Sequence, residues 1–332
     1  MYIKGNSPLD RLIIPVLNAL SLIFKSLSFL NLKRKSFKQK RYPEAFIISI
    51  DNLSFGGTGK TTLVTEIGKH LEAKNIKFAV VTRGYKSTFE SGGTKVQPHH
   101  SAGQVGDEAK IFKTRFPRQD IYVGKNRQVS IEKAIQDNNK IILLDDGFQT
   151  TDVYKDIKIM LVNPSHPYYY LRNFKGLMKT EDFVFFYKHS DDIKQTFPGD
   201  GGPFYGTYDF RLEHFCAADG KTLEIDREKT SLLGFSALGD NPRFKNDLSA
   251  FKLAAFRGYS DHYTYTGDEL AALDKQRIEQ QADYLVCTEK DFIKLKHLDL
   301  THIPLIYVQN RIQFNIDLMD RILKYADEKN YL

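Results

Sequence analysis

Short, strongly hydrophobic runs alternate with helical patterns along the first half of the chain. Residues 46–51 (FIISID) and 141–144 (IILL) are apolar runs rich in β-branched side chains, which is typical of buried strands. Apolar residues between Leu63 and Leu71 recur at the spacing of a helix. The alternation continues to about residue 165. It predicts an α/β fold in which helices flank a parallel sheet.

Further strand patterns occupy the second half of the chain. They lie at 183–187, 205–215, 232–235, 284–288 and 305–308. The run at 205–215 alternates in the manner of an edge strand. The last three runs predict a second, smaller α/β unit, because a chain of 332 residues is long for one compact domain.

The N-terminal segment has a different pattern. Residues 8–30 (PLDRLIIPVLNALSLIFKSLSFL) are the most apolar stretch, and their polar residues from Asp10 to Ser28, except Ser26, fall within roughly one 100° arc of a helix. Pro15 either bends this helix or marks its first turn. A helix with a broad apolar face and a narrow polar stripe is expected to lie in a membrane interface. A core helix and a secretory signal are the alternatives, and the signal lacks a small-residue cleavage site.

Charge supports the membrane interpretation. The net charge is +7, and six of the cations lie within residues 33–41, directly after the apolar segment. Such a run binds anionic headgroups. A nucleic-acid partner is not expected, because no aromatic-interleaved platform accompanies the run. The two cysteines, Cys216 and Cys287, lie far apart, which argues against a disulfide framework or a structural zinc site and favours a reducing compartment.

A glycine-rich segment follows the first predicted strand and precedes the first predicted helix, as in a phosphate-binding P-loop. The expected nucleotide-binding residues are Ser54, Phe55, Gly56, Gly57, Thr58, Gly59, Lys60, Thr61 and Thr62. Backbone N–H groups of such a loop surround phosphate oxygens, the lysine reaches the β and γ phosphates, and the hydroxyl of Thr61 binds Mg²⁺. The general pattern has glycine where this chain has Ser54.

Two acidic residues, Asp145 and Asp146, end the predicted strand at 141–144. Ligands bind at the carboxyl ends of parallel strands, so one or both should hold Mg²⁺. The strand at 77–82 should deliver Arg83 to the same edge. We therefore expect three parts: a membrane-docking segment (1–42), a P-loop domain (43–165) and a second α/β domain (166–332) that closes an active-site cleft. In an alternative arrangement, the last helix of the chain packs against the P-loop domain.

A P-loop indicates nucleotide binding but not the reaction. A small-molecule kinase, a GTPase switch and a membrane-associated ATPase all remain open. A GTPase is disfavoured, because the segment nearest to a guanine-reading motif, Thr288-Glu289-Lys290-Asp291, has lysine and aspartate adjacent.

Seven segments in order resemble motifs of the tetraacyldisaccharide 4′-kinases of lipid A biosynthesis. They are DNLSFGGTGKT (51–61), TRGYK (82–86), VGDEA (105–109), DDGFQ (145–149), GFSALGDNPRF (234–244), DH (261–262) and TEKD (288–291). One such segment would be weak, but seven in sequence are specific.

The resemblance implies transfer of the γ-phosphate of MgATP to the 4′-hydroxyl of an acylated glucosamine disaccharide 1-phosphate, on the cytoplasmic face of the inner membrane of Gram-negative bacteria. It implies that Asp107 is the general base and that Asp261 and His262 assist it. Lys60 would stabilise the transferring phosphoryl group. The expected substrate ligands are Arg83, Glu108, Arg127, Gln149 and Arg172. A monomer is expected. The alternative is a membrane-associated P-loop ATPase or a kinase of another amphiphile.

The chain departs from the family pattern at several positions. Thr150 replaces a histidine, Thr62 a proline and Asn173 an acidic residue, and residues 166–170 lack the usual Pro-x-Gly. These departures affect acceptor binding and the surroundings of the site, and they leave the phosphate-binding glycines, Lys60 and Thr61 in place.

Overall fold

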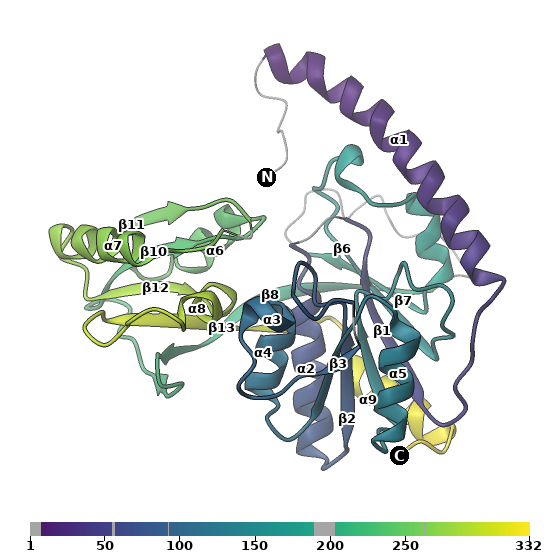
Figure 1. The fold of residues 1–332 in the computed structure, drawn as a ribbon. Helices are drawn as coiled ribbons and strands as arrows, with labels where there is room; N and C mark the ends of the chain where they lie inside the picture. The colour runs from purple at the N-terminus through teal and green to yellow at the C-terminus, as the bar shows by residue number, and fades with distance from the viewer. Residues whose placement is uncertain (1–7, 55–56, 92, 189–202, 262) are drawn as a thin grey trace. The chain divides into compact units, whose positions relative to one another are not determined.

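The computed structural model describes residues 8–54, 57–91, 93–188, 203–261 and 263–332. It divides the chain into two compact units (Figure 1). The larger unit extends to Asp209 and resumes at Ile312, and the smaller unit comprises Phe210–Arg311.

The larger unit is built on a parallel sheet. Its strands are β1 (Phe46–Asn52), β2 (Phe78–Thr82), β4 (Asp120–Val123), β5 (Ile141–Asp145), β6 (Ile157–Val162), β7 (Phe183–Tyr187) and the first part of β8 (Phe204–Ala217). Their order is β8-β7-β6-β1-β5-β2-β4, and the short β3 (Thr94–Lys95) pairs antiparallel with β4. Ile48 of β1 is level with Leu143 on one side and with Ile157 on the other. The carboxyl ends of β1 and β5 therefore lie side by side.

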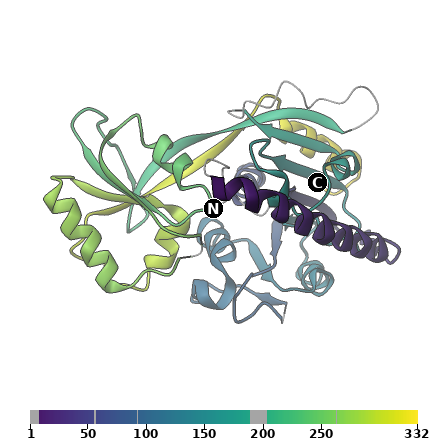
Figure 2. The same ribbon diagram turned by 90° about the horizontal axis from the view of Figure 1, so that it is seen from above.

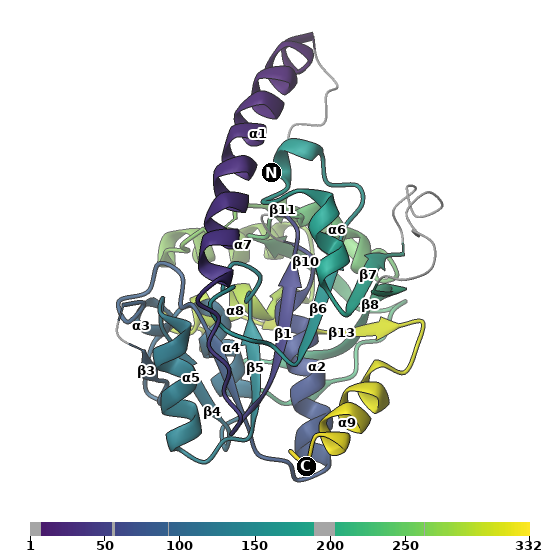
Figure 3. The same ribbon diagram turned by 90° about the vertical axis from the view of Figure 1, so that its right-hand side faces the viewer.

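Helices cover both faces of this sheet. They are α2 (Lys60–Ala73), α3 (Ala102–Val105), α4 (Asp107–Arg115), α5 (Arg127–Gln136) and α9 (Leu318–Glu328). Ile47 of β1 belongs to the core cluster that includes Ile131 of α5, whereas its neighbour Phe46 lies against Tyr325 of α9. Every residue of β1 is buried, which is why the strand has no polar alternation. Figure 3 shows α9 in the same unit as α2 and α5.

The smaller unit has its own core. Its elements are β9 (Thr222–Leu223), β10 (Ser231–Ser236), α6 (Asn241–Asp247), β11 (Lys252–Gly258), α7 (Gly267–Glu279), β12 (Tyr284–Thr288), α8 (Glu289–Leu295) and most of β13 (Leu305–Phe314). The strand order is β11-β10-β12-β13, and these strands pair in parallel. The expected α/β class is confirmed.

Two details differ from the expectations. The larger unit continues past residue 165 to Asp209, because β7 pairs in register with β6, with Phe183 opposite Ile159. The segment 205–215 is not an edge strand, because β8 pairs with β7 at its start and with β9 near its end.

Helix α1 (Pro8–Ser36) packs against a 3₁₀ turn, η1 (Tyr168–Tyr170). Figures 2 and 3 show α1, in purple, as one long helix. It begins at Pro8, so Pro15 lies inside the helix rather than in its first turn. Ser21 and Lys25 of the polar stripe are buried against the protein. The exposed apolar side chains are Leu12, Val16, Leu20, Leu22, Ile23, Phe24, Leu27, Phe29 and Leu30. The apolar face of α1 is therefore turned outward, and from Leu12 to Ser36 the helix is long and apolar enough to cross a membrane by length and composition.

Candidate active site

The phosphate-binding loop joins β1 to α2. Gly57 and Gly59 have φ angles of 71° and 89°, a region that favours glycine. Gly59 caps α2, so Lys60, Thr61 and Thr62 form its first turn, where free N–H groups and the helix dipole attract anions. The predicted strand, glycine turn and helix are thus all present. Phe55 and Gly56 lie outside the described residues.

Lys60 faces the end of β5. Its Nζ lies 3.6 Å from Oδ1 of Asp146, which follows the strand with a left-handed φ of 54°. Burial by itself raises the pKa of Asp146, but Lys60 and Arg172 lower it below its ordinary value. Asp146 is therefore a carboxylate at neutral pH.

Arg172 binds the same carboxylate in a bidentate manner. Its Nη2 and Nη1 donate to Asp146 at 2.6 and 2.9 Å, and Nη2 also donates to the side-chain and backbone oxygens of Asn52. The sequence interpretation assigned Arg172 to substrate binding. In the structure its terminal nitrogens are engaged by the chain itself, and they fix Asp146 next to the lysine of the P-loop.

Asp145 is the deeper of the two aspartates. Thr82 donates a hydrogen bond of 2.9 Å to its Oδ2, and burial raises its pKa to about 7, an effect that Lys60 opposes. Its Oδ1 is buried with no hydrogen-bond partner in the described part of the chain. A buried, unpartnered carboxylate oxygen that lies within the field of Lys60 fits a Mg²⁺ ligand. No group of three or more His, Cys, Asp or Glu among the described residues could hold a metal, so most ligands would have to come from phosphate and water.

Further polar atoms around the loop are buried without partners in the described structure. They are Nδ2 of Asn52, Oγ1 of Thr58, Nε of Arg172 and both polar atoms of the Asn173 side chain. Buried polar groups are rarely left unpaired. Their concentration here is what a site for a polar ligand and its waters requires.

The segments 82–86 and 105–109 contact each other at a glycine in each. A Cβ on Gly84 would lie 2.9 Å from the carbonyl oxygen of Val105, and one on Gly106 would lie 3.1 Å from Cα of Gly84. Both glycines also have positive φ angles. Because of this close approach, the loop after β2 lies against the start of α4. Asp107 and Glu108 form the first turn of that helix, and the charge of Glu108 contributes to the raised pKa of Asp145.

The remaining basic candidates follow β2 and β4. Arg83 forms an ion pair of 2.7 Å with Glu90. Arg127 is buried at the start of α5, where Nη1 donates to the carbonyl oxygen of Gly124 at 2.5 Å and burial lowers its pKa to about 10. The charges of Asp145 and Asp146 oppose that lowering. Gln149 is half-buried in the turn after β5.

Asp261 belongs to the smaller unit, where Lys290 lies 3.8 Å from its Oδ1. His262 lies outside the described residues. Asp291 of the same unit is a structural residue, because its buried carboxylate accepts hydrogen bonds from Thr288, Tyr265 and the backbone N–H of Ala237. The roles expected for Asp261 and His262 stay predictions.

Sequence reasoning missed the contacts that hold the start of the P-loop. Nδ1 of His166 lies 2.8 Å from Oγ of Ser54, and both side chains are buried. Asn52 binds Arg172, as described above. The serine at the usual glycine position was the available signal, since a buried hydroxyl needs a partner.

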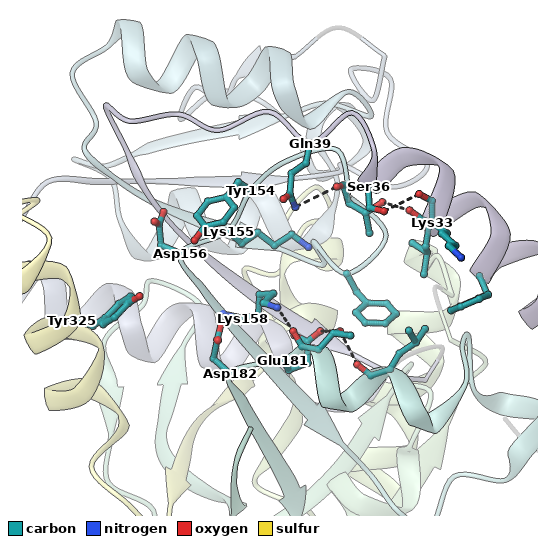
Figure 4. A pocket seen from close by; sticks show the side chains of 16 residues that line it. Lys33, Ser36, Gln39, Tyr154, Lys155, Asp156, Lys158, Glu181, Asp182 and Tyr325 are labelled. Atoms are coloured by element: carbon teal, nitrogen blue, oxygen red, sulfur yellow. Dashed lines mark hydrogen bonds between the residues drawn. The ribbon is translucent and has the colours of Figure 1, made fainter. Parts of the chain in front are cut away.

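A cavity of about 580 Å³ lies in the larger unit (Figure 4). The end of α1, the segment after β5 and a second 3₁₀ turn, η2 (Lys175–Thr180), line it. Lys155 on its wall donates a 2.5 Å hydrogen bond to the carbonyl oxygen of Gly147. Burial raises the pKa of Glu181, also on the wall, to about 8, and the charge of Asp51 adds to the rise. Among the described residues that line the cavity there is none of the predicted site residues.

A family model described as tetraacyldisaccharide-1-P 4′-kinase matches residues 13–327. The chain belongs to this family. The family expected from the seven motifs is confirmed, and so is the enzyme class, a kinase of lipid A biosynthesis.

Relatives in this family match along most of their length. The tetraacyldisaccharide 4′-kinase of Chlamydia caviae is 29% identical over 315 residues, which cover 87% of this chain and 86% of that protein. The tetraacyldisaccharide 4′-kinase of Desulfotalea psychrophila is 27% identical over 318 residues, which cover 88% and 90%. The crystal structure of LpxK from Aquifex aeolicus in complex with ATP matches with a TM-score of 0.74 at 21% identity, covering 95% of this chain and 98% of that chain. This last likeness supports the fold.

Proposed function

We propose that this protein transfers the γ-phosphoryl group of MgATP to the 4′-hydroxyl of a tetraacylated glucosamine disaccharide 1-phosphate, which gives lipid IVA. The observation that carries the proposal is the placement of Lys60 beside Asp146, with Arg172 fixing the carboxylate, in a chain of the 4′-kinase family. Phosphoryl transfer depends mainly on positioning and charge stabilisation, and this arrangement supplies both.

The P-loop holds the nucleotide. The first turn of α2 presents N–H groups and its positive end to the phosphates, and Lys60 offsets the charge that develops on the γ-phosphoryl oxygens. Thr61, Asp145 and Asp146 are the residues that would hold Mg²⁺. Mg²⁺ held by these residues would supply positive charge that neutralises part of the charge of the phosphates.

The acceptor hydroxyl must lose a proton as it attacks phosphorus. We assign Asp107 as the general base, because the Gly84–Gly106 contact places the start of α4 beside the loop after β2. The new O–P bond forms as the bond from the γ-phosphorus to the bridging oxygen breaks, and ADP leaves. Asp261 and His262 are proposed to orient or assist Asp107.

Polar residues around the same sheet edge are proposed to bind the acceptor. Arg83, Arg127, Glu108 and Gln149 supply cations and hydrogen-bonding groups suited to a sugar phosphate. Arg172 is proposed to act on Asp146 rather than on the lipid, since its two terminal nitrogens already bind that carboxylate.

Helix α1 is proposed to bind the cytoplasmic face of the inner membrane through its outward apolar face. The basic run follows directly, and Lys33, Arg34 and Lys35 lie in the last turn of the helix. A lipid acceptor with four acyl chains stays in the bilayer, so the enzyme must work at that surface. The expectation of a monomer remains a prediction.

The deciding experiment measures transfer of ³²P from γ-labelled ATP to the tetraacylated disaccharide 1-phosphate in detergent. We expect a labelled lipid with the wild type and its loss in Lys60→Ala and Asp107→Asn. Asp268→Asn is the matched control, because Asp268 is an exposed aspartate in the first turn of another helix, α7. Steady ATP hydrolysis without a labelled lipid, unaffected by Asp107→Asn, would instead identify a membrane-associated ATPase.

A further inference from the structure

One lysine of α1 is placed unlike the others. Lys25 is completely buried, with 0% of its surface exposed, although Leu22, Ile23 and Leu27 around it are exposed. An apolar residue at this position would avoid the cost of burying an ammonium group. Anchoring to a membrane therefore does not explain why this position is a lysine. The explanation must come from the contacts that the Lys25 side chain makes within the protein.

Lys25 reaches the 3₁₀ turn η1. Its Nζ donates a 2.5 Å hydrogen bond to the carbonyl oxygen of Tyr168 and lies 3.1 Å from the centre of the Tyr168 ring. A cation on an aromatic face and a charged hydrogen bond to a carbonyl are both strengthened by burial. Lys25 is thus bound to one peptide unit at the start of the segment that leads to Arg172.

The carbonyl oxygen of Tyr168 also accepts a second hydrogen bond. The backbone N–H of Leu171 donates to Tyr168 O at 3.1 Å, and this closes the turn. Leu171 in turn forms an antiparallel bridge with Ser54 of the P-loop. The N–H of Arg172 donates to the carbonyl oxygen of Leu53 at 2.8 Å.

The contacts therefore form an unbroken series from the apolar helix to the phosphate site. Lys25 binds Tyr168, the Tyr168 turn fixes Leu171 and Arg172, and these two residues hold the start of the P-loop. The Arg172 side chain continues the series to Asp146, which faces Lys60.

We propose that Lys25 is a positioning residue that couples α1, when bound to a membrane, to the ordering of the P-loop, so that membrane binding tightens ATP binding. This inference rests on the proposed function of the same site. It makes α1 part of the nucleotide site's support as well as an anchor. Residues 166–172 contain no α-helix and no extended strand, only the 3₁₀ turn η1. The conformation of this segment therefore depends on contacts with the rest of the protein.

The experiment measures the dissociation constant of a fluorescent ATP analogue for the full-length protein, with and without vesicles of phosphatidylethanolamine and phosphatidylglycerol. We expect vesicles to tighten binding in the wild type. Lys25→Met, which keeps the length and apolar stem of the side chain, should weaken nucleotide binding about tenfold and abolish the vesicle effect. Lys25→Arg, which retains a cationic donor, should restore part of both.

Two controls separate this role from anchoring and from misfolding. Lys74→Met makes the same substitution at an exposed lysine at the end of α2 and should behave as the wild type. Co-sedimentation with the same vesicles should show Lys25→Met bound as well as the wild type, and its thermal unfolding should remain cooperative.

The proposal is overturned if Lys25→Met binds nucleotide as Lys74→Met does, or if its nucleotide affinity falls only in parallel with vesicle binding. It is also overturned if Lys25→Arg is no better than Lys25→Met. Failure of the proposed function would appear differently, as a wild-type protein that binds ATP but labels no lipid.

Discussion

Arg172 and Asp146 form a bidentate ion pair, with hydrogen bonds of 2.6 and 2.9 Å, and Nζ of Lys60 lies 3.6 Å from the oxygen that accepts the shorter bond. The pair joins the turn after β5 to the segment that precedes β7. It sets the direction of a carboxylate that contacts the P-loop lysine, so the geometry of the pair should matter more than its charge.

Arg172→Lys tests this geometry. Lysine keeps the positive charge but has no planar fork for two parallel hydrogen bonds. We expect kcat to fall by about 10²-fold, in the range seen when one group that stabilises a transition state is lost. Initial rates of labelled lipid formation measure it. Arg118→Lys, at an exposed arginine before β4, is the control, and a wild-type rate in Arg172→Lys would refute the assigned role.

The turn that carries Asp146 also requires a residue without a side chain at position 147. A Cβ there would lie 2.4 Å from Oγ of Ser49 and 2.6 Å from Cδ2 of Leu144. We expect Gly147→Ala to lower the free energy of unfolding by about 1–3 kcal/mol, as other overpacking changes do. Gly176→Ala is the matched control, because a Cβ at Gly176 meets nothing within 4 Å. Urea denaturation of both variants measures the difference, and equal midpoints would contradict this account of the turn.

Glu181 predicts a specific pH dependence of stability. Burial and Asp51 raise its pKa to about 8, while Lys155 and Lys158 oppose the rise. The folded protein therefore holds a proton that the unfolded chain releases near pH 4.5. The protonated Glu181 side chain therefore contributes its full share of the free energy of unfolding below pH 4.5, and this contribution is lost as the pH rises through about 8.

Glu181→Gln removes this titration. We expect the variant to gain stability relative to the wild type as the pH increases from 5 to 9, as measured by thermal unfolding at several pH values. Glu328→Gln, at an exposed glutamate at the end of α9, should follow the wild type. Parallel curves for Glu181→Gln and the wild type would show that Glu181 is ionised in the folded protein.

The outward face of α1 can be tested with a closely matched pair. Ile23 on α1 is 60% exposed, and Ile278 on α7 of the smaller unit is 61% exposed. We expect Ile23→Asn to weaken vesicle binding about tenfold, since it removes a buried apolar side chain from the bilayer and adds a polar one. Ile278→Asn should have no effect. Equal vesicle binding by the two variants in co-sedimentation would show that the outward face of α1 does not bind the membrane.

The sequence by itself determined the elements whose signals are local. The P-loop was predictable because a buried strand, a run of glycines and the start of a helix follow one another within a few residues. The same is true of the amphipathic α1, whose polar stripe is a matter of helical spacing. Seven ordered motifs then indicated the family, which the family model confirmed.

Local pattern could not assign the partners of charged side chains. Arg172 was expected on the substrate, but it binds Asp146, a residue far away in sequence. The registers of β1 with β5 and β6 bring the ends of these strands together, and no spacing in the sequence records that contact. The end of the larger unit at Asp209 likewise depends on the pairing of β7 with β6.

Tertiary structure also decided which way α1 faces. Periodicity gives a polar stripe and an apolar face, but it does not say which of them meets the protein. Here Lys25 and Ser21 are buried, and the apolar face is exposed. The reason is that η1 offers a backbone carbonyl and an aromatic ring to the lysine, a partner that exists only when residues 143 positions apart are brought into contact.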